Sequence, residues 1–347
     1  MRRIICTVPL FMFFCVSSLF AQQDAHFSHF MFNNMYTNAG YTGIEGVSRA
    51  TLIHRSQWLG YQTTNSNDQG KGAPTTQLLS AEHPLKLFSS TVINSGAGFT
   101  FTNDGLGPVR NISFMGNFSY HMKLAQTGGT FGFGVKLGVY SQKIDGSILR
   151  EAEDGDNVVD GLRSSSKGQT KPDMGLGVWY NTKRYYGGVS LNHVNKSTFD
   201  FKQDVINSDL SRHMYVTGGY NIFLNSILIT PSAIIQTDFA ETNFNYGAVA
   251  SMNKYKYWVG ITLRQSFVNN EIEKGGKQLN NDDVVILAGI SLLPKNELRI
   301  GYAFDIVTSG AAAKNATSHE IMVSYVLPFS DGPGQPPLRS PRYRHEN

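Results

Sequence analysis

Hydrophobic and polar residues alternate with period two along most of the chain after residue 46. Such alternation is typical of β-strands, because successive side chains of a strand point to opposite faces of the sheet. The clearest example has an apolar face made of Ile112, Phe114, Phe118, Tyr120, Met122 and Leu124. Its other face is made of Asn111, Ser113, Asn117, Ser119, His121 and Lys123. The pattern therefore predicts strands with one apolar and one polar face.

The same criterion predicts fourteen strands over the whole chain. They lie near residues 47–57, 75–84, 92–102, 109–124, 130–143, 172–180, 184–192, 212–222, 226–236, 244–253, 256–266, 284–293, 297–305 and 318–328. The segments between them tend to alternate between long and short, as do the outside loops and periplasmic turns of outer-membrane barrels. We therefore predict an all-β fold, a transmembrane antiparallel β-barrel of about fourteen strands over residues 47–329, with both termini in the periplasm.

Composition favours this barrel over a soluble β-sandwich or propeller. Only 16% of the 347 residues are charged, while 41% are hydrophobic and 35 are glycine. A soluble sheet would have too little charge to cover its outside, since soluble domains usually carry about 25% charged residues. The mean hydropathy is −0.22, and after the first twenty-odd residues no apolar run approaches the roughly 18 residues of a membrane helix. A helical membrane protein is thereby excluded.

Residues 1–21 have the layout of a secretory signal peptide. Arg2 and Arg3 precede an apolar stretch that ends at Ala21, before polar residues. Cys6 and Cys15 both lie in this segment, so the mature protein is expected to have no cysteine and no thiol chemistry. Removing the two arginines lowers the formal charge from +4 to +2, which gives no argument for nucleic-acid binding.

Two further segments lie outside the predicted strands. Residues 22–46 are rich in aromatic and amide side chains. We expect them to form a periplasmic lead-in that packs against the lower rim, and the alternative is a plug inside the lumen, whose partly wet interior would suit their polar tips. Residues 330–347 form a Pro/Gly-rich tail with three arginines, which is expected to be flexible and to be either a solvated end or a docking peptide for a periplasmic partner.

No motif in the chain indicates catalysis, a cofactor or a metal. The histidines show no metal-binding spacing, and the adjacent His319 and Glu320 should point to opposite faces of the last strand. Several charged residues fall on the polar strand faces, where a charge-paired barrel interior explains them: Lys123, Lys136, Arg264, Arg299, Asp305 and Glu320. We expect a protein that is not an enzyme.

Several motifs, in this order, resemble the PorP/SprF family of type IX secretion outer-membrane proteins of the Bacteroidetes. They include Phe30-Met31-Phe32-Asn33, Asn38-Ala39-Gly40-Tyr41-Thr42-Gly43, Arg55-Ser56-Gln57-Trp58-Leu59-Gly60-Tyr61, Gly72-Ala73-Pro74, Asn103-Asp104-Gly105 and Ser318-His319-Glu320. The motif positions expected to matter for fold or docking are Arg55, Gln57, Trp58, Gly60, Pro74, Asp104, Gly105, His319 and Glu320. The family's usual N-P-A-Y-A-G loses its proline here, which puts a rigid turn at residues 38–43 in doubt.

The resemblance implies a non-enzymatic barrel that works with the secretion and gliding machinery. Its implied partners are a periplasmic ring lipoprotein and that lipoprotein's partner (PorK and PorN in family terms), a peptidoglycan-binding periplasmic protein and a secreted surface adhesin. The tail residues with the expected docking role are Arg339, Arg342, Tyr343 and Arg344. Two other functions stay open: an outer-membrane transporter or porin for a small solute, and an outer-membrane hydrolase with a Ser or Asp near a His at the rim.

Overall fold

The computed structural model describes residues 24–59, 73–87, 93–124, 128–145, 168–202, 206–269, 277–293, 297–308 and 317–328. The predicted signal peptide, the motif residue Gly60 and the tail with Arg339, Arg342, Tyr343 and Arg344 lie outside these residues.

Fourteen long antiparallel strands form the wall, as the alternation predicted. Their bounds are β1 Val47–Ser56, β2 Thr75–Leu85, β3 Ser95–Leu106, β4 Val109–Lys123, β5 Thr130–Ile144, β6 Gln169–Asn181, β7 Tyr185–Asn192, β10 His213–Tyr220, β12 Ile227–Thr237, β13 Thr242–Met252, β14 Tyr257–Asn269, β15 Lys277–Leu292, β16 Leu298–Val307 and β17 Ser318–Pro328. One short extra strand, β11 (Ile222–Leu224), pairs with β12.

The sheet closes on itself. β1 pairs with β17 along its whole length, from Val47 opposite Pro328 to Ser56 opposite His319. The ring is completed on the other side, where β10 pairs with β12. Closure pairs each of the fourteen long strands on both sides, which is the condition for a sheet to stand in lipid. The predicted barrel is confirmed.

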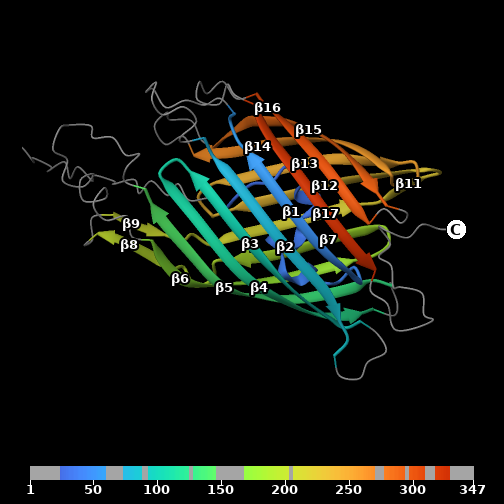
Figure 1. Ribbon diagram of the computed structural model, residues 1–347, viewed down its shortest axis with the longest axis horizontal. Coiled ribbons are helices and arrows are strands. Elements are labelled where there is room, and N and C mark those ends of the chain that lie inside the picture. The colour runs from blue at the N-terminus through green and yellow to red at the C-terminus, as the bar shows by residue number, and fades with distance from the viewer. Residues whose placement is uncertain are drawn as a thin grey trace, which may run out of the picture.

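The two ends of the barrel differ in their connections. One end, called the loop end here, carries the longer connections, including residues 57–74 and 145–168, and lies at the left in Figure 1. The other, called the turn end, carries residues 182–184 and 253–256 as well as the start of β1 and the end of β17. Both ends of the barrel sequence therefore lie at the turn end.

Two loop-end connections differ from the sequence prediction. The loop expected over residues 103–108 is a tight turn, because β3 runs to Leu106 and β4 begins at Val109, with Gly107 in the left-handed conformation. The connection expected over residues 193–211 contains a separate hairpin, β8 (Thr198–Lys202) and β9 (Ile206–Asp209). Both segments extend strand pairing beyond what residue alternation alone indicated.

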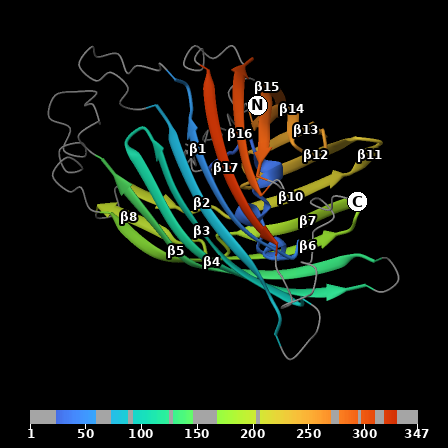
Figure 2. The same cartoon turned by 45° about the vertical axis from the view of Figure 1, so that its right-hand side comes forward.

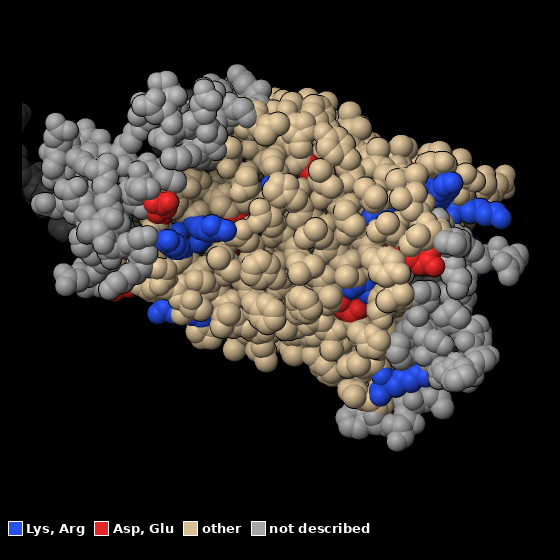
Figure 3. Space-filling model, viewed as in Figure 1, with Lys and Arg blue, Asp and Glu red and all other residues tan. Residues whose placement is uncertain are grey.

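The outward faces of the strands are apolar. Phe114, Leu137 and Ile261 are each more than half exposed, although they lie on central parts of long strands. In the view of Figure 3, charged side chains lie mainly toward the two ends, and the middle of the wall has few of them. An exposed apolar band of this kind is suited to the hydrocarbon region of a membrane. No helix among the described residues is long and apolar enough to cross a bilayer.

Residues 24–46, called the plug here, lie inside the barrel rather than at its rim. The segment contains three short helical turns: η1 (Phe30–Phe32), α1 (Asn34–Thr37) and η2 (Ala39–Tyr41) (Figure 2). The expectation of a periplasmic lead-in is therefore wrong. The physical reason is that the plug has its own apolar side chains: Phe30 and Met31 pack against inward Ile53, Leu78 and Trp258 of the wall.

Candidate functional site

The first contact region between plug and wall is a buried ion network toward the loop end. Arg55 of β1 binds Asp305 of β16 (Nη2 to Oδ2, 2.6 Å) and Glu320 of β17 (Nη1 to Oε2, 3.3 Å). Arg264 of β14 joins it through Asp305 (3.4 Å) and through a shorter contact with Asp283 (2.7 Å). Five neighbouring strands, β1 and β14–β17, thus direct charged side chains into one interior region.

The plug completes this network. The backbone N–H groups of Ser28 and His29 each donate to a carboxylate oxygen of Glu320, both at 2.8 Å. The Ser28 hydroxyl donates to Asp305 (2.9 Å) and accepts from Arg55 (2.5 Å), and His29 Nδ1 lies 2.7 Å from Glu320. Because Arg55, Asp305 and Glu320 are buried, these partners replace the water that the charges would otherwise need.

A second network fixes the end of the plug nearer the turn end. Arg49 of β1 binds Glu45 of the plug (2.6 Å) and Glu82 of β2 (3.1 Å). Arg49 also donates to the hydroxyl of Tyr41 at 2.6 Å. The backbone N–H of Gly43 donates to Glu82 at 2.8 Å, so plug and wall share the same charge cluster.

The 38–43 motif, whose Tyr41 and Gly43 belong to the second network, contacts the opposite wall through Asn38. The side-chain amide of Asn38 donates to the carbonyl oxygens of Val178 in β6 (3.0 Å) and Val189 in β7 (3.2 Å). Its Oδ1 accepts from the N–H of Gly40 at 2.9 Å. This local bond caps η2, so Asn38 supplies the turn geometry without the proline usual in the family motif.

Strand glycines let the plug backbone lie directly on the wall. A Cβ at Gly134 of β5 would overlap with the backbone of Ala39 and Gly40. A Cβ at Gly177 of β6 would overlap with the Asn38 side chain. Part of the high glycine content is explained by this close approach, since any side chain at these positions would displace the plug.

A third cluster, near the loop end, was not predicted from the sequence. His193, just after β7, contacts Asp24 (Nε2 to Oδ1, 2.9 Å) and Asp173 of β6 (Nδ1 to Oδ2, 2.8 Å). The Tyr215 hydroxyl and the Nε2 atom of His213 also bind Asp24. Burial alone would lower the pKa of His193, but Asp24 and Asp173 outweigh it and raise the pKa to about 10.

This third cluster has no signal in residue spacing, because its members come from the plug, β6, the 193–212 connection and β10. Among the described residues, the groups that hydrogen-bond the two imidazoles are Asp24, Asp173 and the carbonyl of Ser211. None of these is a hydroxyl nucleophile, so the cluster has no Ser–His pair, whereas two carboxylates, Asp24 and Asp173, do lie beside His193.

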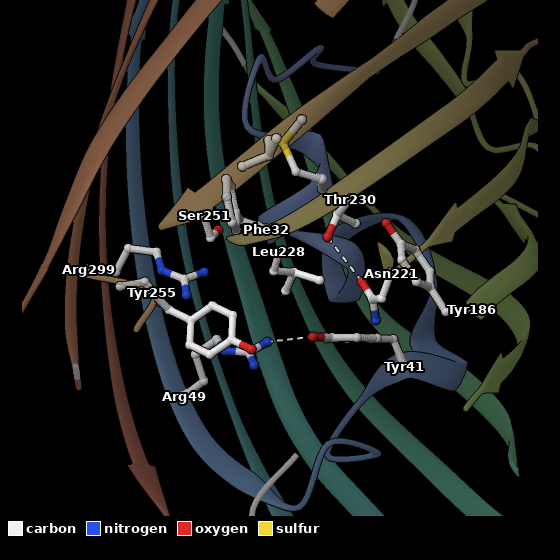
Figure 4. A pocket seen from close by; sticks show the side chains of 13 residues that line it. Phe32, Tyr41, Arg49, Tyr186, Asn221, Leu228, Thr230, Ser251, Tyr255 and Arg299 are labelled. Atoms are coloured by element: carbon white, nitrogen blue, oxygen red, sulfur yellow. Dashed lines mark hydrogen bonds between the residues drawn. The ribbon is translucent and has the colours of Figure 1, made fainter. Parts of the chain in front are cut away.

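At the turn end the plug forms the floor of an open pocket with ≈ 700 Å³ of empty space. Phe32 and Tyr41 come from the plug, and Arg49, Arg299 and Tyr255 from the wall (Figure 4). The Arg299 guanidinium lies 5.0 Å from the centre of the Phe32 ring. The pocket thus combines aromatic surface with cationic side chains, a combination suited to a protein or peptide ligand.

The family described as type IX secretion system membrane protein PorP/SprF matches residues 19–325. The chain belongs to the PorP/SprF family. It is therefore a membrane component of the type IX secretion system with the barrel of an outer-membrane protein. The curated proteins include no match to this PorP/SprF chain.

Solved outer-membrane barrels resemble the PorP/SprF chain in fold. The "CymD monoaromatic hydrocarbon channel" is 13% identical with a TM-score of 0.48, covering 86% of this chain and 92% of that one. BamA from Haemophilus ducreyi lacking POTRA domains 1–3 is 10% identical with a TM-score of 0.41, covering 82% and 70%. Salmonella typhi OmpF in complex with daunomycin is 9% identical with a TM-score of 0.37, covering 82% and 98%.

The PorP/SprF motif residues that the sequence singled out fall into two groups. Arg55 and Glu320 meet in the buried network, whereas His319 points outward and contacts the hydroxyl of Tyr302 (2.5 Å). The other described motif residues lie toward the loop end. There the backbone N–H of Gln57 donates to the carbonyl oxygen of Pro74 (2.9 Å), and the backbone N–H of Trp58 donates to the hydroxyl of Ser318 (3.1 Å). The hydroxyl of Thr76 donates to the carboxylate of Asp104 (2.5 Å), and Gly105 lies opposite Thr75 in the pairing of β2 with β3.

Replacing Asn38 by alanine is expected to lower the free energy of unfolding of this PorP/SprF barrel by about 1–3 kcal/mol. The variant removes the buried side-chain amide of Asn38 and leaves the part-buried carbonyls of Val178 and Val189 without this donor, and such a loss costs about that much. Urea titration of the detergent-solubilised barrel measures the change. Asn195→Ala is the matched control, because Asn195 is exposed in the 193–212 connection, and an equal loss in both variants would contradict the prediction.

Proposed function

We propose that this protein is a non-enzymatic outer-membrane anchor that couples the type IX secretion and gliding machinery to periplasmic components and supports export or attachment of a secreted adhesin. The observation that carries the proposal is the plug. Plug residues contact wall strands around the barrel, from β1 and β2 through β4–β7 to β16 and β17. A lumen filled in this way favours a scaffold over a conduit for cargo.

The turn end is the proposed docking face. In outer-membrane barrels the short turns face the periplasm, which would place both ends of this barrel sequence on that side. The aromatic and cationic pocket opens at this end, and its floor belongs to the plug. A partner bound there would contact wall and plug together. The proposed partners are the ring lipoprotein and its partner and a peptidoglycan-binding protein, with the arginine-containing tail as a second contact.

Photo-crosslinking in the native envelope tests the orientation and the coupling. Asn253 and Ala240 are exposed residues at the turn end and the loop end, on either side of strand β13. A photoreactive residue at position 253 is expected to crosslink to periplasmic ring components, whereas the same residue at position 240 is not. Ring crosslinks from position 240 alone, or from neither position, would reject the proposal.

A solute transporter is the competing function. The plug counts against it, because a transported solute would have to pass a segment whose backbone is bonded to the wall. Planar-bilayer conductance distinguishes the two functions, because a transporter with an open lumen should conduct with the plug in place, whereas a plugged scaffold should conduct only after the plug is deleted.

A further inference from the structure

Two histidines and one carboxylate meet at the loop end in the arrangement of a metal site. Asp24 is the first described residue of the plug, His193 follows β7, and His213 begins β10. One oxygen of Asp24 and one nitrogen of each imidazole lie within 4.8 Å of one another. Both histidines are buried, and Asp24 is held by the Tyr215 hydroxyl.

The hydrogen bonds around the two imidazoles direct the same ring nitrogen toward Asp24. His193 Nδ1 is bonded to the carboxylate of Asp173 at 2.8 Å, and His213 Nδ1 to the carbonyl of Ser211 at 3.0 Å. The Nε2 atom of His193 lies 2.9 Å from Asp24 Oδ1, and that of His213 lies 3.2 Å from the Asp24 backbone nitrogen. Metal-binding histidines typically donate their second ring N–H to a carboxylate or a backbone carbonyl, which fixes the tautomer.

We propose that this cluster binds a zinc-like divalent cation through Nε2 of His193, Nε2 of His213 and the carboxylate of Asp24. Two imidazoles and one carboxylate are a donor set that suits zinc, with one coordination position left for water. Binding would release the proton that His193 shares with Asp24, because only a neutral imidazole is a ligand. It would also replace the bond from the Asp24 backbone N–H to His213.

The surroundings provide space for an ion, and the position of the ligands has a consequence. A polar pocket with ≈ 480 Å³ of empty space is lined by Asp24, Asp173 and His193, so it lies beside two of the three proposed ligands. Asp24 belongs to the plug, whereas His193 directly follows wall strand β7 and His213 begins wall strand β10. The bound ion would therefore fasten the start of the plug to two neighbouring wall strands, β7 and β10, in addition to the hydrogen bonds described above.

Titration of the metal-stripped barrel tests the proposal. The mature full chain, purified from outer membranes in detergent and treated with a chelator, is titrated with zinc by calorimetry. We expect a single high-affinity zinc per chain, loss of that site in the His193→Gln/His213→Gln variant, and about 10- to 100-fold weaker binding in Asp173→Asn. His319→Gln is the matched control, since His319 points outward, and it should bind zinc like the parent protein.

X-ray absorption of the zinc-loaded parent protein identifies the zinc ligands directly, so the proposal can be tested even if a variant fails to assemble. Two imidazole nitrogens at about 2.0–2.1 Å are expected. Zinc binding is also expected to raise the unfolding temperature of the parent protein. Absence of a high-affinity site, unchanged binding in the double variant, or a spectrum without imidazole ligands would overturn the proposal and leave the cluster as a buried ion pair.

Discussion

Replacing Arg55 by methionine is expected to destabilise the barrel by about 3–5 kcal/mol, the usual cost of removing one partner of a buried ion pair. Arg55 donates hydrogen bonds to Asp305, to Glu320 and to the plug residue Ser28. Methionine fills similar space but offers no N–H donor, so both carboxylates lose a partner within the interior. The unfolding midpoint in urea, followed by tryptophan fluorescence of the detergent-solubilised barrel, measures the loss.

The matched control is Arg184→Met, which removes the same charge from an exposed turn-end position. Surface changes of this kind usually alter stability by less than about 0.5 kcal/mol. If both variants lost the same stability, the effect would arise from net charge rather than from the buried network. The prediction would then be wrong.

The wall of the barrel was predictable because its signal repeats along the sequence. In a lipid-facing strand every second residue must be apolar, so Phe114, Phe118 and Tyr120 identify the outer face of β4 without knowledge of any partner strand. The strand pairing order then follows from short connections between consecutive antiparallel strands. Local rules therefore gave the strand number and the faces.

The plug position was not predictable from the same rules. Its bonds join residues far apart in sequence, such as Ser28 with Glu320 and Asn38 with Val189. The plug packs against apolar wall residues that include Trp258 and Leu78. These side chains lie on the inward, mainly polar face of their strands, where they interrupt the alternation of polar and apolar residues. The alternative of a plug rested on polar tips alone, whereas its apolar residues also hold it in the lumen.

The third cluster, Asp24 with His193 and His213, was also not predictable from the sequence, because its residues come together only in the folded barrel. Asp24, His193 and His213 have no motif spacing, and only the closure of β7 against β10 brings the two imidazoles together. The expectation that no metal binds was based on spacing and could not consider this juxtaposition. Arg55 and Glu320 were found because the family motifs include them, although the sequence did not indicate that they meet.

Deleting residues 24–46 is expected to convert a non-conducting barrel into an open channel. The plug separates the turn-end pocket from the polar pocket near the loop end, and its removal would join the two spaces. Planar-bilayer recordings should show no stepwise conductance for the parent protein and regular steps for the deletion variant. Open steps in the parent protein would instead support the transporter function.

Gly134→Val tests the same effect without shortening the chain, because the new side chain would enter the space of Ala39 and Gly40 and displace the plug from β5. Its matched control is Gly116→Val on the adjacent strand β4. Gly116 faces outward, and a Cβ there meets only the Leu137 carbonyl oxygen, at an ordinary 3.5 Å. We expect intermittent conductance and protease cleavage near residue 38 in Gly134→Val alone. Equal behaviour of the two variants would show that contact of the plug backbone with the strand glycines is not what keeps the lumen closed.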